Sequence, residues 1–338
     1  MVMRKKIFIL GVGEAKHVGG QLRKAAEKLD LDFRFMDVRE AGQGNRLLAK
    51  LVWKLAKRPI QLTRFSRNVL AYVEQDRPKM VLTTGMGPLD CSSLKKIGSM
   101  GVRTVNFSTD DPWNPAHRAD WFLKALPYYG AVFSTRRANL EEFRDAGVRE
   151  VEFLPFGYDP DLYFPDASGS EEPKVFLAGG GDVDRYPLVK ALKEDNIALS
   201  LWGGYWERAG LKSSGFLDAA GIRHEAAKCM VSLVVVRRAN RDGSAMRSFE
   251  IPACGGCCVV EDTKEHREMF GPDGEAVLYF RTPIELVSRV REAFTNPELR
   301  SKLRMNVHKL ITARPNTYAD RLKKMIKWAE GREEKDKK

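Results

Sequence analysis

Two successive series of short apolar runs, each alternating with helical patterns, constrain the fold of this chain most strongly. The first series predicts strands at Lys6–Gly11, Phe33–Val38, Met80–Thr84, Arg103–Ser108, Ala131–Ser134 and Val151–Phe153. The second predicts strands at Lys174–Ala178, Ala198–Trp202, Val231–Val236, Cys257–Val260 and Ala276–Tyr279. Strands that are apolar throughout and alternate with helices are typical of parallel sheets covered on both faces. The sequence therefore predicts an α/β fold.

A segment rich in Pro, Asp, Gly and Ser, Tyr158–Pro173, separates the two series and has the composition of a linker. The length of 338 residues also exceeds what one core usually organises. We expect two Rossmann-like domains, residues 1–168 and 172–314. The apolar positions of residues 316–331 recur at helical spacing, which predicts a last helix with one apolar face that can dock. Residues 332–338 are expected to form a flexible tail.

Composition favours a globular protein with sizeable cores, because 43% of the residues are hydrophobic. The apolar run Ile7–Leu10 is too short for the core of a signal peptide, and no run approaches the roughly 18 residues of a membrane-spanning helix. The five cysteines do not suggest a secreted disulfide framework. Cys254 and Cys257 have C-x-x-C spacing, but nothing completes a metal site, and packing is the favoured interpretation. A cytoplasmic location is expected.

The segment that starts at Ser244 carries the clearest functional signal. It places Arg247 and Glu250 on a short predicted helix that runs into the Gly255–Gly256 turn and then into a buried strand. A helix N-terminus and an arginine both favour a diphosphate, and a glutamate one turn further along can accept hydrogen bonds from a ribose diol. Together these features predict a nucleotide-sugar site, whereas each alone has an ordinary structural explanation.

Ligands of parallel sheets bind beyond the carboxyl ends of the strands. There, Gly179–Gly181 follows a strand and leads to Arg185 at the start of a helix, offering backbone N–H groups and a cation to a phosphate. No Walker motif follows, and a tight turn without a ligand is the alternative. In the first series, Gly11 and Gly13 lack the third glycine of a dinucleotide fingerprint, which disfavours a dinucleotide site.

Ordered motifs along the chain resemble one enzyme family. They are Val175–Gly179 with Arg185, Leu201–Trp206, Arg247–Gly256, Glu285-Leu286 ahead of Asn296-Pro297-Glu298, and Thr317–Arg321, with Pro78–Leu82, Asp110–Pro112 and Leu154–Asp159 in the first half. This pattern resembles the CgeB-like, spore-maturation-type glycosyltransferases with a glycosyl-transferase-group-1 domain. The most specific part is Arg-x-Phe-Glu-Ile-Pro-Ala-Cys-Gly-Gly.

The resemblance implies a GT-B fold, in which two Rossmann-like domains face each other across a cleft and a C-terminal helix crosses back to the N-terminal domain. It implies transfer of a sugar from a nucleotide-diphosphate donor in the second domain to an acceptor held mainly by the first. Related retaining enzymes often carry two glutamates separated by seven residues. Glu250 matches the second, but Asp242 replaces the first, which leaves its contact with the sugar open.

Departure of the nucleoside diphosphate is the difficult step, so cations around the diphosphate are expected to give the largest catalytic effect. Arg185 and Arg247 are the expected cations, and Glu250 and Asp242 complete the expected catalytic set. The nearest Asp-x-Asp match begins at Asp182 and is unconvincing, so we expect no metal. No cofactor is expected, the nucleotide sugar being a substrate of undetermined base. The resemblance also implies transfer with retention, in which the leaving phosphate can serve as base toward the acceptor.

The expected binding residues fall into two groups. Those on the donor side are Gly179, Gly180, Gly181, Trp202, Gly203, Tyr205, Trp206, Ser244 and Glu250; their aromatic rings can stack on a base or belong to the core. Those on the acceptor side are Gly13, Glu14, His17, Asp110, Asp111 and Trp113. Among these, His17 suits a general base or a turn cap, and Asp110–Trp113 suits sugar contact or a plain turn. A glycan, a lipid-linked molecule or a protein remains open as the acceptor.

The formal net charge of +12 favours an anionic partner. Part of it lies in Arg46–Arg58, a predicted helix with a leucine stripe and with Trp53 among basic residues on the other side. An exposed tryptophan in a basic face is typical of interfacial membrane binding, which points to peripheral attachment at the inner face of a membrane. The alternative is a helix packed by its leucines with a solvated basic side.

Two other functions fit parts of the sequence. A catalytically silent nucleotide-sugar-binding or scaffold module is one, because Asp242 departs from the usual glutamate. A basic nucleic-acid-binding protein is the other. The sequence shows no zinc-finger, helix-turn-helix or common RNA-module pattern, so nucleic acid is disfavoured as a partner.

Overall fold

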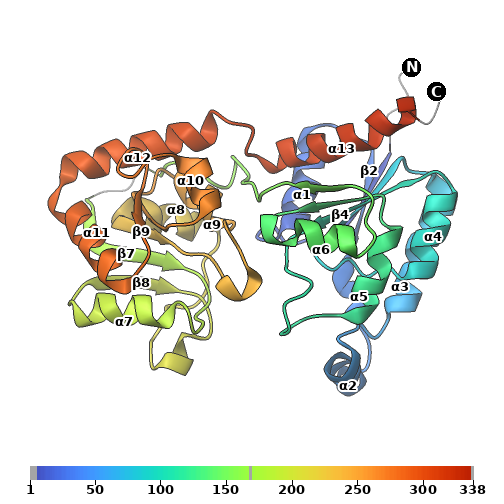
Figure 1. Cartoon of the computed structure of the whole chain (residues 1–338), viewed down its shortest axis with the longest axis horizontal. Coiled ribbons are helices and arrows are strands. Elements are labelled where there is room, and N and C mark those ends of the chain that lie inside the picture. The colour runs from blue at the N-terminus through green and yellow to red at the C-terminus, as the bar shows by residue number, and fades with distance from the viewer. Residues whose placement is uncertain (1–5, 167–169, 336–338) are drawn as a thin grey trace. The chain divides into compact units, whose positions relative to one another are not determined.

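The computed structural model describes residues 6–166 and 170–335, which form two compact units (Figure 1). Unit 1 contains the chain up to Pro155, the short segment Ala239–Arg241 and the C-terminal helix from Tyr318. Unit 2 contains Phe156–Arg238 and Asp242–Thr317. The predicted boundary at residue 168 and the end of the predicted tail, residues 336–338, lie outside the described residues.

Unit 1 is built on a six-stranded parallel sheet with the order β2-β1-β3-β4-β5-β6. Its strands are β1 (Ile7–Gly11), β2 (Phe33–Asp37), β3 (Met80–Thr84), β4 (Arg103–Ser108), β5 (Ala131–Ser134) and β6 (Val151–Phe153). Its α-helices are α1 (Val18–Lys28), α2 (Arg46–Ala56), α3 (Leu62–Asp76), α4 (Cys91–Ser99), α5 (Asp120–Ala125), α6 (Leu140–Asp145) and α13 (Tyr318–Lys335), and its 3-10 turns are η1 (Val38–Gly42), η2 (Leu126–Tyr128) and η3 (Arg137–Asn139). The last helix therefore extends through the first part of the predicted tail.

The sheet of unit 1 is covered on both faces. Phe8 and Leu10 of β1 and Val81 of β3 share one core with Val69 of α3 and Leu94 of α4. Because side chains alternate along a strand, the residues between them point to the other face. There, α1 packs on β1 and against α13 (Figure 1). The C-terminal helix thus belongs to the unit that contains the N-terminal strand.

Unit 2 is built on a five-stranded parallel sheet with the order β11-β10-β9-β7-β8. Its strands are β7 (Glu172–Ala178), β8 (Ala198–Trp202), β9 (Cys229–Val234), β10 (Cys258–Glu261) and β11 (Leu278–Phe280). Its helices are α7 (Tyr186–Glu194), α8 (Ala219–Lys228), α9 (Arg247–Ala253), α10 (Lys264–Phe270), α11 (Pro283–Thr295) and α12 (Pro297–Thr312), with the 3-10 turn η4 (Trp206–Ala209); the turn η5 (Arg238–Asn240) includes residues of both units. Each predicted strand of both series is present within a few residues of its expected bounds, which confirms the α/β fold.

The segment Tyr158–Pro165 was expected to be part of a linker, but the structure packs it into unit 2. The rings of Tyr158 and Tyr163 are buried, and Tyr158 forms an isolated bridge with Thr317. Asp159 accepts a hydrogen bond from the backbone N–H of Asp161 at 3.0 Å. The burial of two large aromatic side chains thus orders a segment whose Pro- and Asp-rich composition predicted a linker.

The strand order reverses between β1 and β3 in unit 1 and between β7 and β9 in unit 2. At such a point the helices that follow the two strands lie on opposite faces of the sheet, which leaves room for a ligand at the carboxyl ends of the strands. In unit 2, this position lies between the loop after β7 and the loop after β9. Each helix in the described ranges is too short or too polar to span a bilayer.

Candidate functional site

The loop after β7 is held close to the loop after β8 by backbone hydrogen bonds. The N–H of Gly179 donates to the carbonyl of Trp202 at 2.9 Å, and the N–H of Gly181 donates to that of Gly204 at 2.9 Å. Gly203 has φ +118°, and a Cβ atom there would lie 2.2 Å from the carbonyl oxygen of Gly179. Only glycine fits this approach, so the sequence itself brings the two loops together.

Arg185 ties the loop after β7 to the loop after β9. Its Nη1 donates to the carbonyl of Gly180 at 2.8 Å, and its Nη2 donates to that of Val235 at 3.4 Å. Its side chain is buried, and Nε lies 3.7 Å from the carboxylate of Asp182. Burial lowers the pKa of Arg185, whereas the negative charges of Asp182 and Asp242 act to raise it. A positive charge is therefore fixed where the strand order reverses.

Glu250 and Ser244 each contribute a buried polar atom to the segment after β9. Glu250 is fully buried, and its Oε2 pairs with the guanidinium of Arg247. Its Oε1 and the Oγ of Ser244 are both buried and have no hydrogen-bond partner within the described part of the chain. Leaving a buried polar atom without a partner costs about 1–3 kcal/mol. These two atoms are therefore candidates for contact with a ligand.

A buried histidine, His266, supports the start of α9 through hydrogen bonds. The N–H of Ala245 donates to Ser248 Oγ at 3.0 Å, and that oxygen lies 2.8 Å from Nε2 of His266. The other ring nitrogen, Nδ1, lies 2.7 Å from the carbonyl oxygen of Glu261. Burial lowers the pKa of His266, so the ring is neutral and acts as a hydrogen-bonding support. The helix has only seven residues, so Arg247 itself is the more effective positive group for a phosphate.

The three aromatic residues expected on the donor side have different surroundings. Trp206 is fully buried, and its Nε1 donates to the carbonyl of Gly179 at 2.9 Å, so it supports the loop and offers no ring face to a ligand. Trp202 is half-buried, with its Nε1 donating to Ser200 Oγ at 2.7 Å. Tyr205 alone of the three is exposed, at 57%, with the guanidinium of Arg208 4.7 Å from its ring centroid.

The cysteines of the C-x-x-C pattern are packing residues. Cys254, Cys257 and Cys258 are buried and free. Burial raises the pKa of the Cys254 and Cys257 thiols to about 12, so neither is a thiolate near neutral pH. Within residues 6–166 and 170–335, no three His, Cys, Asp or Glu side chains are arranged as metal ligands would be.

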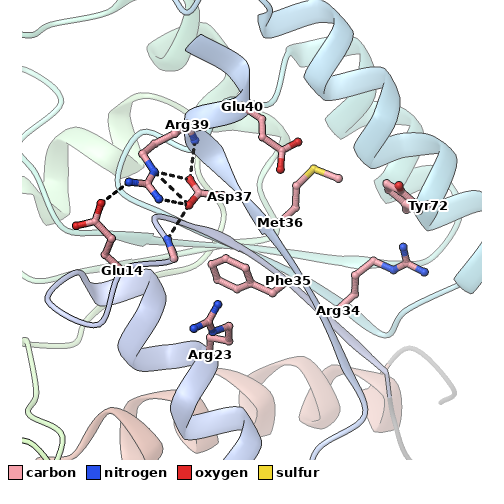
Figure 2. A pocket seen from close by; sticks show the side chains of 10 residues that line it. Glu14, Arg23, Arg34, Phe35, Met36, Asp37, Arg39, Glu40 and Tyr72 are labelled. Atoms are coloured by element: carbon pink, nitrogen blue, oxygen red, sulfur yellow. Dashed lines mark hydrogen bonds and ion pairs between the residues drawn. The ribbon is translucent and has the colours of Figure 1, made fainter. Parts of the chain in front are cut away.

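Unit 1 has a polar cavity of about 560 Å³ beside β2, lined by Gly13 and Glu14 among others (Figure 2). Asp37, at the end of β2, accepts a hydrogen bond from the N–H of Gly13 at 3.0 Å and pairs with the guanidinium of Arg39, whose other arm reaches Glu14. Burial alone would raise the pKa of Asp37, but the hydrogen bonds from Arg39 and Gly13 lower it to about 2. The wall of the cavity on this side is thus a fixed network of charges.

The other acceptor-side candidates do not line this cavity. Asp111 is buried and bound by the guanidinium of Arg241 at 2.7 Å and by the Asn139 amide at 3.0 Å, which gives it a structural role in unit 1. Trp113 packs edge-on against Phe143, with ring centroids 4.8 Å apart.

Two further candidates remain accessible. His17 is exposed, begins α1 as its N-cap residue without a side-chain cap bond, and lies 3.9 Å from a carboxylate oxygen of Glu14. Asp110 is half-buried at the end of β4, with its carboxylate 3.4 Å from Thr109 Oγ1.

Sequence reasoning missed Asp37 and Arg39, which organise the charges of the cavity. A usable signal existed, because an acidic residue at the end of the second strand lies beside the loop after the first strand in Rossmann-like sheets. Because the glycine fingerprint after β1 is incomplete, no binding residue was expected at the end of β2. In the structure, the N–H of Gly13 and the carboxylate of Asp37 do meet.

Comparison with known proteins supports the fold and gives a family match for the second half of the chain. Residues 185–327 match the family described as glycosyl transferase-like. No curated protein matches the chain. Among solved structures, a sucrose-phosphate synthase from Thermosynechococcus elongatus superposes with a TM-score of 0.72 at 13% identity, covering 97% of this chain and 100% of that chain.

Two other solved structures show the same architecture. A glycosyltransferase from Rickettsia africae has a TM-score of 0.65 at 11% identity, covering 97% of this chain and 98% of that chain. The Anabaena protein HepE, solved with UDP-glucose, has a TM-score of 0.64 at 14% identity, covering 96% of this chain and 99% of that chain. The chain therefore has the GT-B fold, and its second half contains a glycosyl transferase-like domain.

Proposed function

We propose that this protein is a glycosyltransferase that takes a sugar from a nucleotide-diphosphate donor bound by unit 2. The observation that carries the proposal is the set of side chains after β7 and β9. Arg185 and Arg247 supply positive charge, and Glu250 Oε1 and Ser244 Oγ are buried polar atoms without a partner in the described ranges. In this proposal, residues 172–314 bind the donor.

When the donor binds, Arg247 exchanges its present partner, Glu250, for the diphosphate. In the structure, its guanidinium pairs with Glu250, yet about 30% of its side chain is exposed, so it can turn toward a diphosphate. That movement leaves the carboxylate of Glu250 to accept hydrogen bonds from the two ribose hydroxyls. Arg185 is already fixed by two backbone carbonyls, so it needs no reorganisation. The exposed ring of Tyr205 offers a stacking surface to the base.

In the transfer step, the bond between the anomeric carbon and the β-phosphate oxygen breaks, and the phosphate leaves with the electron pair. Arg185 and Arg247 stabilise the charge that develops on it. The acceptor hydroxyl bonds to the anomeric carbon on the same face that the phosphate leaves, and its proton passes to the leaving phosphate. This step gives retention, which we propose from the resemblance to retaining enzymes that carry two glutamates at the spacing of Asp242 and Glu250. Asp242 is assigned to the sugar hydroxyls.

We further propose that the reaction needs neither a metal ion nor a cofactor. The two arginines supply the charge that a metal would otherwise bring. In addition, Asp182, the start of the nearest Asp-x-Asp match, accepts hydrogen bonds from the N–H groups of Asp184 at 3.1 Å and Arg185 at 3.0 Å, so its carboxylate holds the turn. Activity that persists in excess EDTA supports this proposal, and activity that requires added Mg²⁺ or Mn²⁺ contradicts it.

The acceptor is assigned to unit 1, which the helix from Tyr318 completes. It is a glycan, a lipid-linked molecule or a protein. The cavity at Gly13 and Glu14 is the acceptor-side feature with the clearest geometry. The five free cysteines suit a reducing compartment, so we place the reaction in the cytoplasm.

A thermal-shift panel tests the donor site. UDP, GDP, TDP, ADP and CMP are each added to wild type, Arg247→Ala and Glu250→Ala, because a ligand that binds the native state raises the melting temperature. Asp195→Asn is the matched control, since Asp195 pairs with Arg291 at 2.5 Å on another part of unit 2. We expect one nucleoside diphosphate to stabilise wild type and the control, and to lose its effect in both site variants.

Donor turnover separates an enzyme from a silent module. Wild type incubated with sugar derivatives of the stabilising nucleotide should release that nucleotide, and Glu250→Ala should release little. Stabilisation without release from any sugar donor, with or without glycan acceptors, supports a silent nucleotide-sugar-binding module. A salt-sensitive gel shift with nucleic acid that nucleotide sugars do not compete supports the nucleic-acid alternative.

A further inference from the structure

Helix α2 carries the largest group of exposed apolar side chains on one element of unit 1. Leu47, Leu51 and Leu55 are 79%, 52% and 77% exposed, and no residue of the helix is buried. The alternative interpretation, a helix packed by its leucine stripe, is therefore wrong. Figure 1 shows α2 standing at the margin of unit 1, joined to it by loops.

The helix is held in shape at both ends. Asn45 caps its N-terminus, with Oδ1 accepting from the N–H groups of Leu47 at 3.0 Å and Leu48 at 3.1 Å. At the C-terminal end, Nε1 of Trp121 donates to the carbonyl of Lys57 at 2.8 Å, which fastens the end of the helix to α5. The apolar residues are therefore presented on a formed helix.

Two parallel ridges run along the exposed side of α2. Leu47, Leu51 and Leu55 recur every fourth residue and form an apolar ridge. Arg46, Lys50 and Lys54 recur with the same period, one residue earlier, and form a basic ridge beside it; all three are exposed. The leucines can thus enter an apolar layer while the basic groups next to them stay at its polar surface.

Charge decides which partner suits these ridges. Residues 41–73 contain seven Lys or Arg and no Asp or Glu. A second copy of the chain would bring like charges together, which is unfavourable. The apolar ridge follows a single convex helix, a shape that suits a flat layer. An anionic surface with an apolar layer beneath it satisfies both ridges.

We propose that α2 is an interfacial helix that attaches the protein to anionic lipid bilayers. The helix lies in the plane of the membrane, with the leucine ridge among the acyl chains and the basic ridge at the lipid phosphates. At 11 residues it is about 17 Å long, too short to cross the apolar layer. Attachment does not depend on the proposed transferase reaction and is testable without a sugar donor.

Vesicle sedimentation with the whole protein tests this proposal. The vesicles contain phosphatidylcholine alone or phosphatidylcholine mixed with phosphatidylglycerol. One variant combines Leu47→Gln, Leu51→Gln and Leu55→Gln, and a second combines Lys50→Gln and Lys54→Gln. The matched control is Ile284→Gln, because Ile284 is 83% exposed on α11 of unit 2, outside the two ridges. These side chains are exposed, so circular dichroism and the melting temperature should match wild type.

We expect wild type and the control to bind the anionic vesicles, to bind neutral vesicles weakly, and to dissociate as salt rises. The lysine variant should bind about 25-fold more weakly, since each basic group near an anionic surface contributes about fivefold. The leucine variant should lose at least about tenfold. Equal binding to both vesicle types, or full binding by the leucine variant, overturns the proposal. So does a dimer that requires the three leucines and forms in a protein that binds no vesicles.

Discussion

At the scale of single residues, the loops of the donor domain depend on one glycine. The left-handed backbone of Gly203 and its 2.2 Å approach to Gly179 mean that Gly203→Ala must displace backbone. We expect a loss of at least about 3 kcal/mol in the unfolding free energy. Gly210→Ala is the control, because Gly210 has φ +68° with open space around it and should cost only about 1–2 kcal/mol. Equal losses in urea unfolding would show that the two loops do not need the close approach.

A second residue prediction concerns the charge network of the cavity in unit 1. Asp37 has a folded-state pKa of about 2, below the unfolded value of about 3.9. Its stabilising contribution is therefore complete above about pH 5 and is lost as the pH falls through 4 toward 2. We expect the stability difference between wild type and Asp37→Asn to stay constant from neutral pH to about pH 5 and to shrink below pH 4. A difference that does not change with pH in chemical unfolding would contradict the assignment.

The distance along the chain between interacting residues explains which candidate residues the sequence could predict. Arg185, Arg247 and Glu250 were expected from local motifs, and the structure does bring charged and hydrogen-bonding atoms of these residues to the loops after β7 and β9. Asp111 was expected on the acceptor side, and Trp206 was expected either to stack on a base or to belong to the core. Their burial depends on distant partners, such as Arg241 for Asp111, and no local pattern reports such a pairing.

At the scale of elements, α2 should behave as a unit that opens on its own. Because none of its residues is buried, Asn45→Ala should remove the cap and speed amide exchange along the helix, with the global melting temperature unchanged. Asp90→Ala is the contrasting variant. Asp90 caps α4 at 2.8 Å, and α4 has a buried face, so this change should lower the global stability by about 1 kcal/mol. Equal global losses would mean that α2 is packed after all.

The strands were the most predictable elements, and the reason is physical. A strand buried on both faces is mostly apolar, as in Met80–Leu82 and, apart from Ser232, in Val231–Val234, so its sequence alone reveals it. The surroundings of the leucine stripe of α2, by contrast, could not be predicted from the sequence. Amphipathic spacing predicts the helix but not what covers its apolar side, because packing and membrane attachment require the same spacing.

At the scale of the whole molecule, the chain has two separate cores, one in each unit. Units with their own cores can unfold in separate transitions. We expect two calorimetric transitions, of which a bound nucleoside diphosphate raises only the one that belongs to unit 2, because the proposed donor residues all lie in that unit.

A matched pair of core substitutions assigns the transitions. Val69 and Val290 are both fully buried, in the cores of unit 1 and unit 2 respectively. Val69→Ala should lower one transition and Val290→Ala the other, each by the equivalent of about 2 kcal/mol. The transition that nucleotide raises should be the one that Val290→Ala lowers. If nucleotide instead raises the transition that Val69→Ala lowers, the donor binds unit 1, and the roles assigned to Arg185, Arg247 and Glu250 are wrong.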